Sequence, residues 1–152
     1  LGDVYKRQEQ GYKVAVVSNK LQSATQSLCE HFFGELVPLA VGDNPSMAKK
    51  PEADMVNEAL CRLNRSRANA VYVGDSEVDI ETAKNSRMKL IMVEWGFRKR
   101  ADMEKLGAGC FIDKPEKIFD ILKATPEYPR RAEADNRILQ LLRDEKYIQR
   151  KG

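Results

Sequence analysis

Residues 71–79 read Val-Tyr-Val-Gly-Asp-Ser-Glu-Val-Asp, and this stretch decides how the rest of the sequence is interpreted. Its first three residues combine β-branched and aromatic side chains, which is typical of a buried strand, and Gly74 ends that run. Ser76 is followed three residues later by Asp79, a pattern similar to the capping box that opens a helix. A strand followed at once by a helix is part of a βαβ unit, so Asp75 is predicted to lie at the carboxyl end of a parallel strand.

Further apolar runs of the same kind lie on both sides of this stretch. The predicted strands are Val14–Val17, Val37–Val41, Ala70–Val73, Leu90–Val93 and Cys110–Ile112. Each is almost entirely apolar, as expected of a strand that helices cover on both faces. Helical patterns alternate with these runs, so the sequence predicts an α/β fold, a Rossmann-like parallel sheet with helices on both faces.

The predicted helices are marked by apolar residues three to five positions apart. The stripes are Ala24, Leu28 and Phe32; Ala53, Val56, Leu60 and Leu63; and Val78 with Ala83, and a last helix is predicted over Pro115–Leu122. Residues 9–123 are therefore predicted to form one core domain. Residues 1–8 fit neither pattern and are interpreted as a non-native leader. Residues 124–152 are interpreted as a linker plus an appended amphipathic helix, which we expect to pack on the parent domain.

Composition argues against several classes of protein. The 152 residues carry 26 basic and 23 acidic side chains, and the basic surplus lies in residues 123–152, so the main body offers no basic face for nucleic acid. Cys29, Cys61 and Cys110 form no Cys-x-x-Cys pair, which argues against a zinc site or a disulfide framework. No apolar run approaches the roughly 20 residues that cross a bilayer. We therefore expect a cytoplasmic protein that binds neither nucleic acid nor a membrane.

Polar groups follow three of the predicted elements. Ser18 and Asn19 come after the first strand, Lys50 opens the second helix, and Asp75 follows residues 70–73. Because the carboxyl ends of parallel strands share one edge of a sheet, these groups are expected to converge. Hydroxyl and amide donors, a compact cation and a carboxylate are what a phosphate group and a hard metal ion require. The oxygen-rich set favours Mg²⁺ over zinc.

Each of these residues also has an ordinary structural interpretation. Ser18 or Asn19 could simply cap the helix that follows them. Lys50 by itself could be a surface lysine, and the Ser76 and Asp79 pair could be no more than a helix cap. What favours a site is that the polar groups recur, in order, at successive strand ends.

The motifs resemble those of the haloacid dehalogenase-like (HAD) superfamily of hydrolases. Residues 14–20 (Val-Ala-Val-Val-Ser-Asn-Lys) resemble motif II, residues 49–51 (Lys-Lys-Pro) motif III and residues 71–79 motif IV, with its Gly-Asp-x-x-x-Asp spacing. The resemblance extends from about Gly11 to Leu122. Glu94-Trp95-Gly96-Phe97-Arg98 and the segment from Ala108 to Ile112 are similar to the phosphoglycolate phosphatase-like branch.

The resemblance implies a Mg²⁺-dependent phosphatase that works through an aspartyl-phosphate intermediate. Ser18 and Asn19 would bind the phosphoryl oxygens, and Lys50 would neutralise charge on the nucleophile and the phosphoryl group. Asp75 would hold Mg²⁺, and Asp79, one helical turn further on, would orient Lys50 or a metal-bound water. Gly74 and Ser76 would support this turn. The implied substrate is a small phosphorylated metabolite, such as phosphoglycolate.

Motif I, which carries the nucleophilic aspartate in this superfamily, occurs nowhere in the sequence, and neither does the helical cap domain. We therefore interpret the chain as an amino-terminally truncated fragment. In the superfamily the strand of motif I lies between the strands that end near Ser18 and Asp75, so both neighbours would lose a pairing partner. We expect the isolated chain to be weakly stable or self-associating and to lack turnover.

Three alternatives stay open. A phosphomutase or a phosphonate hydrolase of the same superfamily would share these motifs. A receiver-type signalling domain uses similar groups, but it places its acidic residues first and its lysine last, whereas Ser18 and Lys50 precede Asp75 here. A non-catalytic phosphate-binding or interaction protein is the third. His31 and Trp95 are assigned no catalytic role: His31 is interpreted as structural, and Trp95 as core or as a wall of the substrate mouth.

Overall fold

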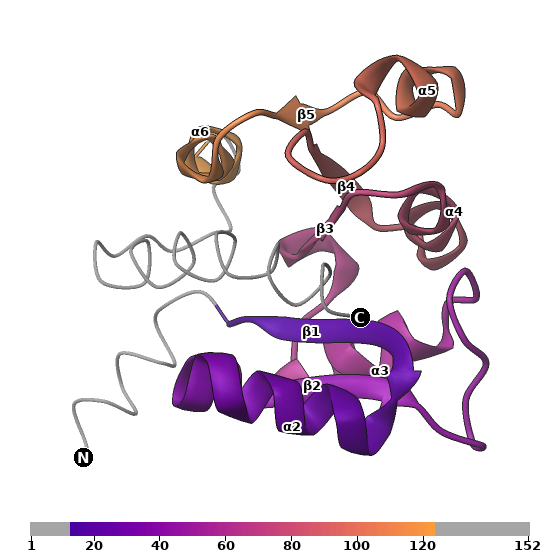
Figure 1. Cartoon of the computed structure of the whole chain (residues 1–152), viewed down its shortest axis with the longest axis vertical. Helices are drawn as coiled ribbons and strands as arrows, with labels where there is room; N and C mark the ends of the chain where they lie inside the picture. The colour runs from indigo at the N-terminus through magenta and orange to yellow at the C-terminus, as the bar shows by residue number, and fades with distance from the viewer. Residues whose placement is uncertain (1–12, 124–152) are drawn as a thin grey trace.

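The computed structural model describes residues 13–123, which form parallel strands covered by helices (Figure 1). The strands are β1 (Ala15–Leu21), β2 (Leu39–Asp43), β3 (Val71–Gly74), β4 (Lys89–Val93) and β5 (Phe111–Ile112). The helices are α2 (Gln22–Phe33), α3 (Asp54–Leu63), α4 (Glu77–Ser86), α5 (Arg100–Lys105) and α6 (Ile118–Lys123), with 3-10 turns η1 (Gly34–Leu36), η2 (Arg67–Asn69) and η3 (Pro115–Lys117). The expected leader, residues 1–8, and the expected linker and helix, residues 124–152, lie outside the described residues.

All five predicted strands are present, with shifted ends. β1 continues past Val17 to Leu21, so Ser18 and Asn19 lie inside the strand and not in a loop after it. β2 begins at Leu39, two residues later than predicted. The reason is Pro38, which has no N–H to donate to a neighbouring strand.

The β1–β2 sheet is parallel and lies between α2 and α3. One face carries Val14, Val16 and Ala40, which pack against Cys29 and Phe33 of α2. The other face carries Ala15, Val17 and Val41, which pack against Met55 and Ala59 of α3. Successive residues of β1 therefore face opposite helices, which explains why the strand is apolar throughout.

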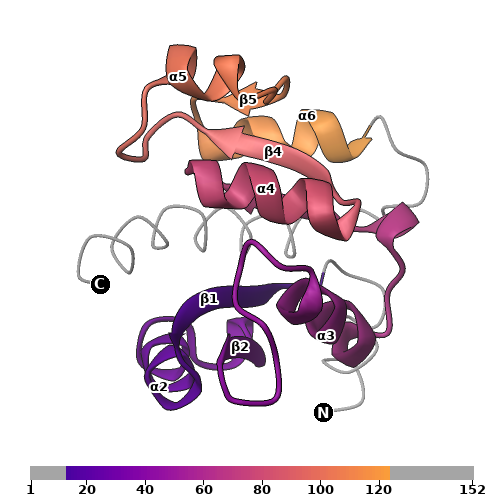
Figure 2. The same cartoon turned by 90° about the vertical axis from the view of Figure 1, so that its right-hand side faces the viewer.

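The second sheet has the order β3-β4-β5, and all its pairs are parallel. On one face, Val71, Val73, Ile91 and Val93 pack with Ile118 and Leu122 of α6. On the other face, Tyr72 and Leu90 pack with Val56 and Leu60 of α3 and with Ala83 of α4. Figure 2 shows α4 and α6 beside β4. The prediction of parallel strands covered by helices on both faces is confirmed.

The predicted apolar stripe of α2 is displaced by one residue. The buried residues are Thr25, Cys29 and Phe33, whereas Ala24 is exposed and Leu28 is half-buried. Thr25 can occupy a buried position because its hydroxyl donates to the carbonyls of Lys20 and Leu21, at 3.2 and 3.0 Å. The first buried residue of α2 is therefore polar, and the pattern of apolar residues alone could not locate the buried face.

The prediction that Val78 belongs to the buried stripe of α4 is also wrong, since 36% of this residue is exposed. The buried face of α4 is mostly polar and consists of Asp79, Thr82, Ala83 and Ser86. The hydroxyls of Thr82 and Ser86 donate to carbonyls one turn earlier in the helix, at 2.7 and 2.6 Å. The burial of these groups is therefore compensated within the helix itself.

Within residues 13–123 no strand pairing joins β1 to β3. This gap lies where the family resemblance places the strand of motif I. Helix α3 connects the two sheets, because Val56 packs in one cluster with Tyr72 of β3 and Val17 of β1. The connection between β2 and α3 rises from the first sheet toward α4 (Figure 2). Polar residues from both sheets meet along this connection.

No helix within the described range combines the length and apolar character needed to cross a membrane.

Candidate functional site

Asn19 fixes the backbone of Lys50. Its side-chain oxygen accepts the Lys50 N–H at 2.8 Å, and its side-chain amide donates to the Lys50 carbonyl at 3.0 Å. The Lys50–Pro51 peptide bond is cis. Helix α2 begins at Gln22 without a side-chain cap, so neither Ser18 nor Asn19 caps it. Ser18 accepts the backbone N–H of Lys20 at 3.2 Å, which turns its hydroxyl oxygen toward the end of β1.

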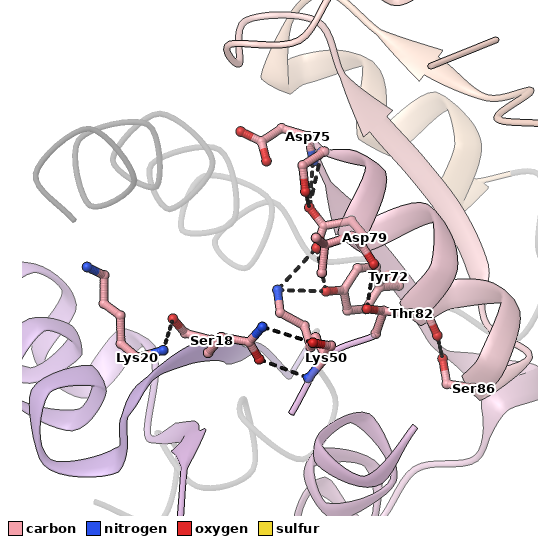
Figure 3. A network of polar contacts seen from close by, with 11 residues as sticks. Ser18, Lys20, Lys50, Tyr72, Asp75, Asp79, Thr82 and Ser86 are labelled. Carbon is pink, nitrogen blue, oxygen red and sulfur yellow. Dashed lines mark hydrogen bonds and ion pairs between the residues drawn. The ribbon is translucent and has the colours of Figure 1, made fainter. Parts of the chain in front are cut away.

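The Lys50 side chain lies in a closed triangle of polar contacts (Figure 3). Its Nζ donates to Oδ1 of Asp79 at 3.1 Å and to the Tyr72 hydroxyl at 3.2 Å, and that hydroxyl donates to the same Oδ1 at 2.7 Å. Only 14% of the Lys50 side chain and 8% of the Asp79 side chain are exposed. An ammonium group has three N–H donors, so within the described residues this triangle leaves one for a ligand.

The second oxygen of the Asp79 carboxylate organises the turn between β3 and α4. Oδ2 accepts the backbone N–H groups of Asp75 and Ser76 at 3.0 and 3.2 Å, and the Ser76 hydroxyl at 3.1 Å. Ser76 is the N-cap of α4, so the predicted capping box is present. A Cβ at Gly74 would lie only 2.3 Å from the Cβ of Asp79, and glycine is therefore required where the chain passes this carboxylate.

Asp79 is ionised in this setting. Burial by itself would raise the pKa of its carboxyl group, but the Lys50 charge, the Asp75 N–H and the Tyr72 hydroxyl outweigh burial and hold that pKa below its ordinary value. Both carboxylate oxygens already accept hydrogen bonds from the protein. Asp79 thus contacts Lys50 directly, and its role in orienting Lys50 or a metal-bound water stays a prediction.

Asp75 lies at the other end of the site, on the far side of Asp79 from Lys50 (Figure 3). It is half-buried. Burial, followed by the negative charge of Asp79, raises the pKa of the Asp75 carboxyl group, although Lys50 and Arg98 oppose the rise. A nearby divalent cation would favour the ionised form of this carboxylate, so Asp75 suits a position as a Mg²⁺ ligand.

Asp75 alone does not complete a metal site. Among residues 13–123, no group of three or more His, Cys, Asp or Glu side chains is arranged to hold a metal ion. The remaining ligands would have to be substrate oxygens, water and groups outside the described residues.

The structure therefore joins Asn19, Lys50 and Asp79 in a continuous chain of hydrogen bonds, with Ser18 and Asp75 at its two ends. Sequence reasoning missed Tyr72, which reads as a core residue of an apolar strand. The available signal was that a buried Tyr hydroxyl requires a hydrogen-bonding partner. Trp95 is partly buried against the Ile91 cluster, and His31 is exposed with its ring against Phe32.

Comparison with known proteins places this geometry in a family. Residues 4–93 match the profile of the haloacid dehalogenase-like hydrolases. The chain belongs to this family. Over 92 residues it is 33% identical to a phosphoglycolate phosphatase of Rhodobacter capsulatus, an alignment that covers 60% of the chain and 41% of that protein. It is 29% identical over 118 residues to the pyrophosphatase PpaX of Bacillus cereus, covering 74% of the chain and 53% of the relative.

Solved structures of HAD-like proteins share the same fold. A proposed phosphoglycolate phosphatase from Lactobacillus delbrueckii subsp. bulgaricus superposes with a TM-score of 0.72 and 40% identity, covering 78% of this chain and 49% of that protein. A variant of CbbY from Rhodobacter sphaeroides, solved with xylulose-(1,5)bisphosphate, gives a TM-score of 0.57 at 25% identity, covering 72% of this chain and 50% of that one. The chain thus spans about half the length of these relatives.

Proposed function

We propose that this chain is part of a Mg²⁺-dependent phosphatase that hydrolyses a small phosphate monoester, such as phosphoglycolate. The observation that carries the proposal is the buried Lys50, which Asp79 and Tyr72 hold so that, among residues 13–123, one of its N–H donors remains for a ligand. A buried ammonium group with a single open donor is suited to one oxygen of a phosphoryl group. Relatives that are named phosphatases, and one solved with a sugar bisphosphate, support this class of substrate.

In this proposal each residue has a defined task. Ser18 donates its hydroxyl to a second phosphoryl oxygen, while Lys50 offsets the negative charge that collects during transfer. Asn19 keeps Lys50 in place through its two bonds to the Lys50 backbone. The groups that bind phosphate thus come from β1 and from the connection before α3, and they are held in position before the ligand arrives.

Among residues 13–123, Asp75 is the residue that would hold Mg²⁺. When bound, the ion supplies positive charge that offsets the charge of the phosphoryl group. The attacking carboxylate of an aspartyl-phosphate mechanism belongs to motif I, which this sequence does not contain. We infer that the 152-residue chain by itself binds phosphate without hydrolysing esters.

The test is a calorimetric titration of the chain with inorganic phosphate, with and without Mg²⁺. Phosphate should bind in both conditions and more tightly with Mg²⁺, because the ion and the anion attract each other in one site. Replacement of Asp75 with asparagine should weaken Mg²⁺ binding by about tenfold or more. Mg²⁺ should then no longer increase the affinity for phosphate.

Asp54→Asn is the control, because Asp54 is an exposed carboxylate on α3 that binds the Ala48 N–H. It should leave the Mg²⁺ effect intact. Absence of saturable phosphate binding in the unsubstituted chain, with or without Mg²⁺, would contradict the proposed function.

A further inference from the structure

The loop between β4 and α5, residues 94–99, lies directly against Asp75. A Cβ built on Gly96 would be 2.7 Å from both the Cβ and the Oδ2 of Asp75, and 3.1 Å from its Cγ. Only a glycine allows the backbone to approach the carboxylate this closely. One side of the Asp75 side chain is therefore bounded by main chain rather than by solvent.

A second contact connects the same two loops. Arg98 binds Glu77 through two hydrogen bonds, Nε to Oε2 at 2.6 Å and Nη2 to Oε1 at 2.9 Å. Arg98 lies two residues after Gly96, and Glu77 lies two residues after Asp75. β3 and β4 are adjacent and parallel, with Gly74 opposite Met92, so the two loops leave the sheet side by side.

This ion pair contributes little to stability by itself. The side chains of Arg98 and Glu77 are 48% and 45% exposed. Surface ion pairs of this kind are screened by solvent and salt, so their main effect is geometric. A two-bond guanidinium–carboxylate contact does fix the relative orientation of the groups it joins.

We propose that residues 94–98 form a positioning element for Asp75, in which Gly96 limits the orientation of the carboxylate and the Arg98–Glu77 pair holds the loop in place. The inference rests on the proposed function, since it assigns Asp75 to a divalent cation. Arg98 and Glu77 are positioning residues that act through Asp75, and the loop therefore sets metal affinity rather than phosphate affinity.

The experiment measures two affinities for each variant: inorganic phosphate without metal, and Mg²⁺ in the presence of phosphate. Gly96→Ala should weaken Mg²⁺ binding by about 10- to 100-fold, and Arg98→Ala by about tenfold, the range found when groups that orient a metal ligand are changed. Phosphate affinity without metal should change by less than about twofold, because both substitutions lie beside Asp75 and not beside the proposed phosphate ligands Ser18 and Lys50. The exchanged pair Glu77→Arg with Arg98→Glu should recover much of the Mg²⁺ affinity lost in Arg98→Ala.

Arg62→Ala is the matched control, because Arg62 forms a pair with Glu58 on α3 at 2.6 Å with similar exposure, away from Asp75. It should leave both affinities unchanged. Normal Mg²⁺ binding by Arg98→Ala and Gly96→Ala would overturn the inference and leave the proposed function standing. If the unsubstituted chain binds phosphate but not Mg²⁺, the assignment of Asp75 to the metal fails. If it binds neither ligand, the proposed function fails.

Discussion

Replacement of Asp79 with alanine is expected to lower the free energy of unfolding by about 3–5 kcal/mol, the cost of removing one partner from a buried ion pair. The Lys50 ammonium group would lose its counter-ion in a position where 14% of its side chain is exposed. Two backbone N–H groups, of Asp75 and Ser76, would lose their acceptor at the start of α4. Urea denaturation monitored by circular dichroism measures the change, either as a lower midpoint or as loss of the cooperative transition.

Two variants control for this result. Glu81→Ala removes an exposed carboxylate from the same helix and should change stability by no more than about 0.5 kcal/mol. Combining Lys50→Met with Asp79→Ala should cost less than the sum of the two single changes, because the double variant has no unpaired buried charge. If Asp79→Ala costs no more than Glu81→Ala, the buried triangle does not stabilise the fold.

Replacement of Lys50 with alanine is expected to weaken inorganic phosphate binding by about 10- to 100-fold, since a hydrogen bond to a charged group contributes about 1.5–3 kcal/mol. The chain offers a matched control in the preceding residue. Lys49 carries the same charge, but 58% of its side chain is exposed and it forms an ion pair with Asp43 at 3.3 Å. Lys49→Ala should leave the dissociation constant for phosphate unchanged within about twofold at 150 mM salt, where exposed charges are screened.

Lys50→Arg separates charge from geometry. Arginine keeps the positive charge, but its planar fork cannot reproduce the compact three-donor arrangement between Asp79 and Tyr72. It should therefore recover part of the affinity only. If Lys49→Ala and Lys50→Ala weaken phosphate binding equally, then the affinity depends on net charge and Lys50 is not a specific phosphate ligand.

The strands were predictable because helices cover both their faces, and strands buried on both faces have continuous apolar sequences. Their ends were less predictable. The shift of β2 to Leu39 follows from Pro38, and the extension of β1 to Leu21 carries polar residues that an apolar pattern does not include. Register and length thus depend on which backbone groups find partners in the neighbouring strand.

The helix faces were harder to predict where buried residues are polar. Thr25 on α2 can be buried because its hydroxyl bonds to carbonyls at the end of β1. Thr82 and Ser86 on α4 can be buried because their hydroxyls bond to carbonyls of the preceding turn. Hydrophobic periodicity assigns such residues to the surface, so it displaced the predicted stripe of α2 and placed Val78 wrongly in the core. Short hydroxyl side chains at helical spacing can mark a buried face as well as an exposed one.

The site residues were grouped by their order along the sequence, but their connections were not predictable. The expectation that Lys50 opens the second helix is wrong, because α3 begins at Asp54 and Lys50 lies in the connection before it. Sequence alone could not show that Asn19 binds the Lys50 backbone across 31 positions of chain, or that Tyr72 and Asp79 share Lys50. These contacts depend on tertiary structure, which brings the β2–α3 connection against Asn19 of β1 on one side and against Tyr72 and Asp79 on the other. Gly96 was singled out only as part of a family-like segment, and its approach to Asp75 became evident from the distances.

An NMR titration of the lysine ammonium resonances in ¹⁵N-labelled chain with inorganic phosphate shows directly whether Lys50 binds phosphate. The Lys50 resonance is assigned by its loss in Lys50→Ala, and Lys49 by the corresponding variant. The Lys50 resonance is expected to shift saturably as phosphate binds, while Lys49 and the other exposed lysines shift only weakly and without saturation. A Lys50 resonance that stays in place while phosphate binds would contradict the assignment of this residue as the phosphate ligand.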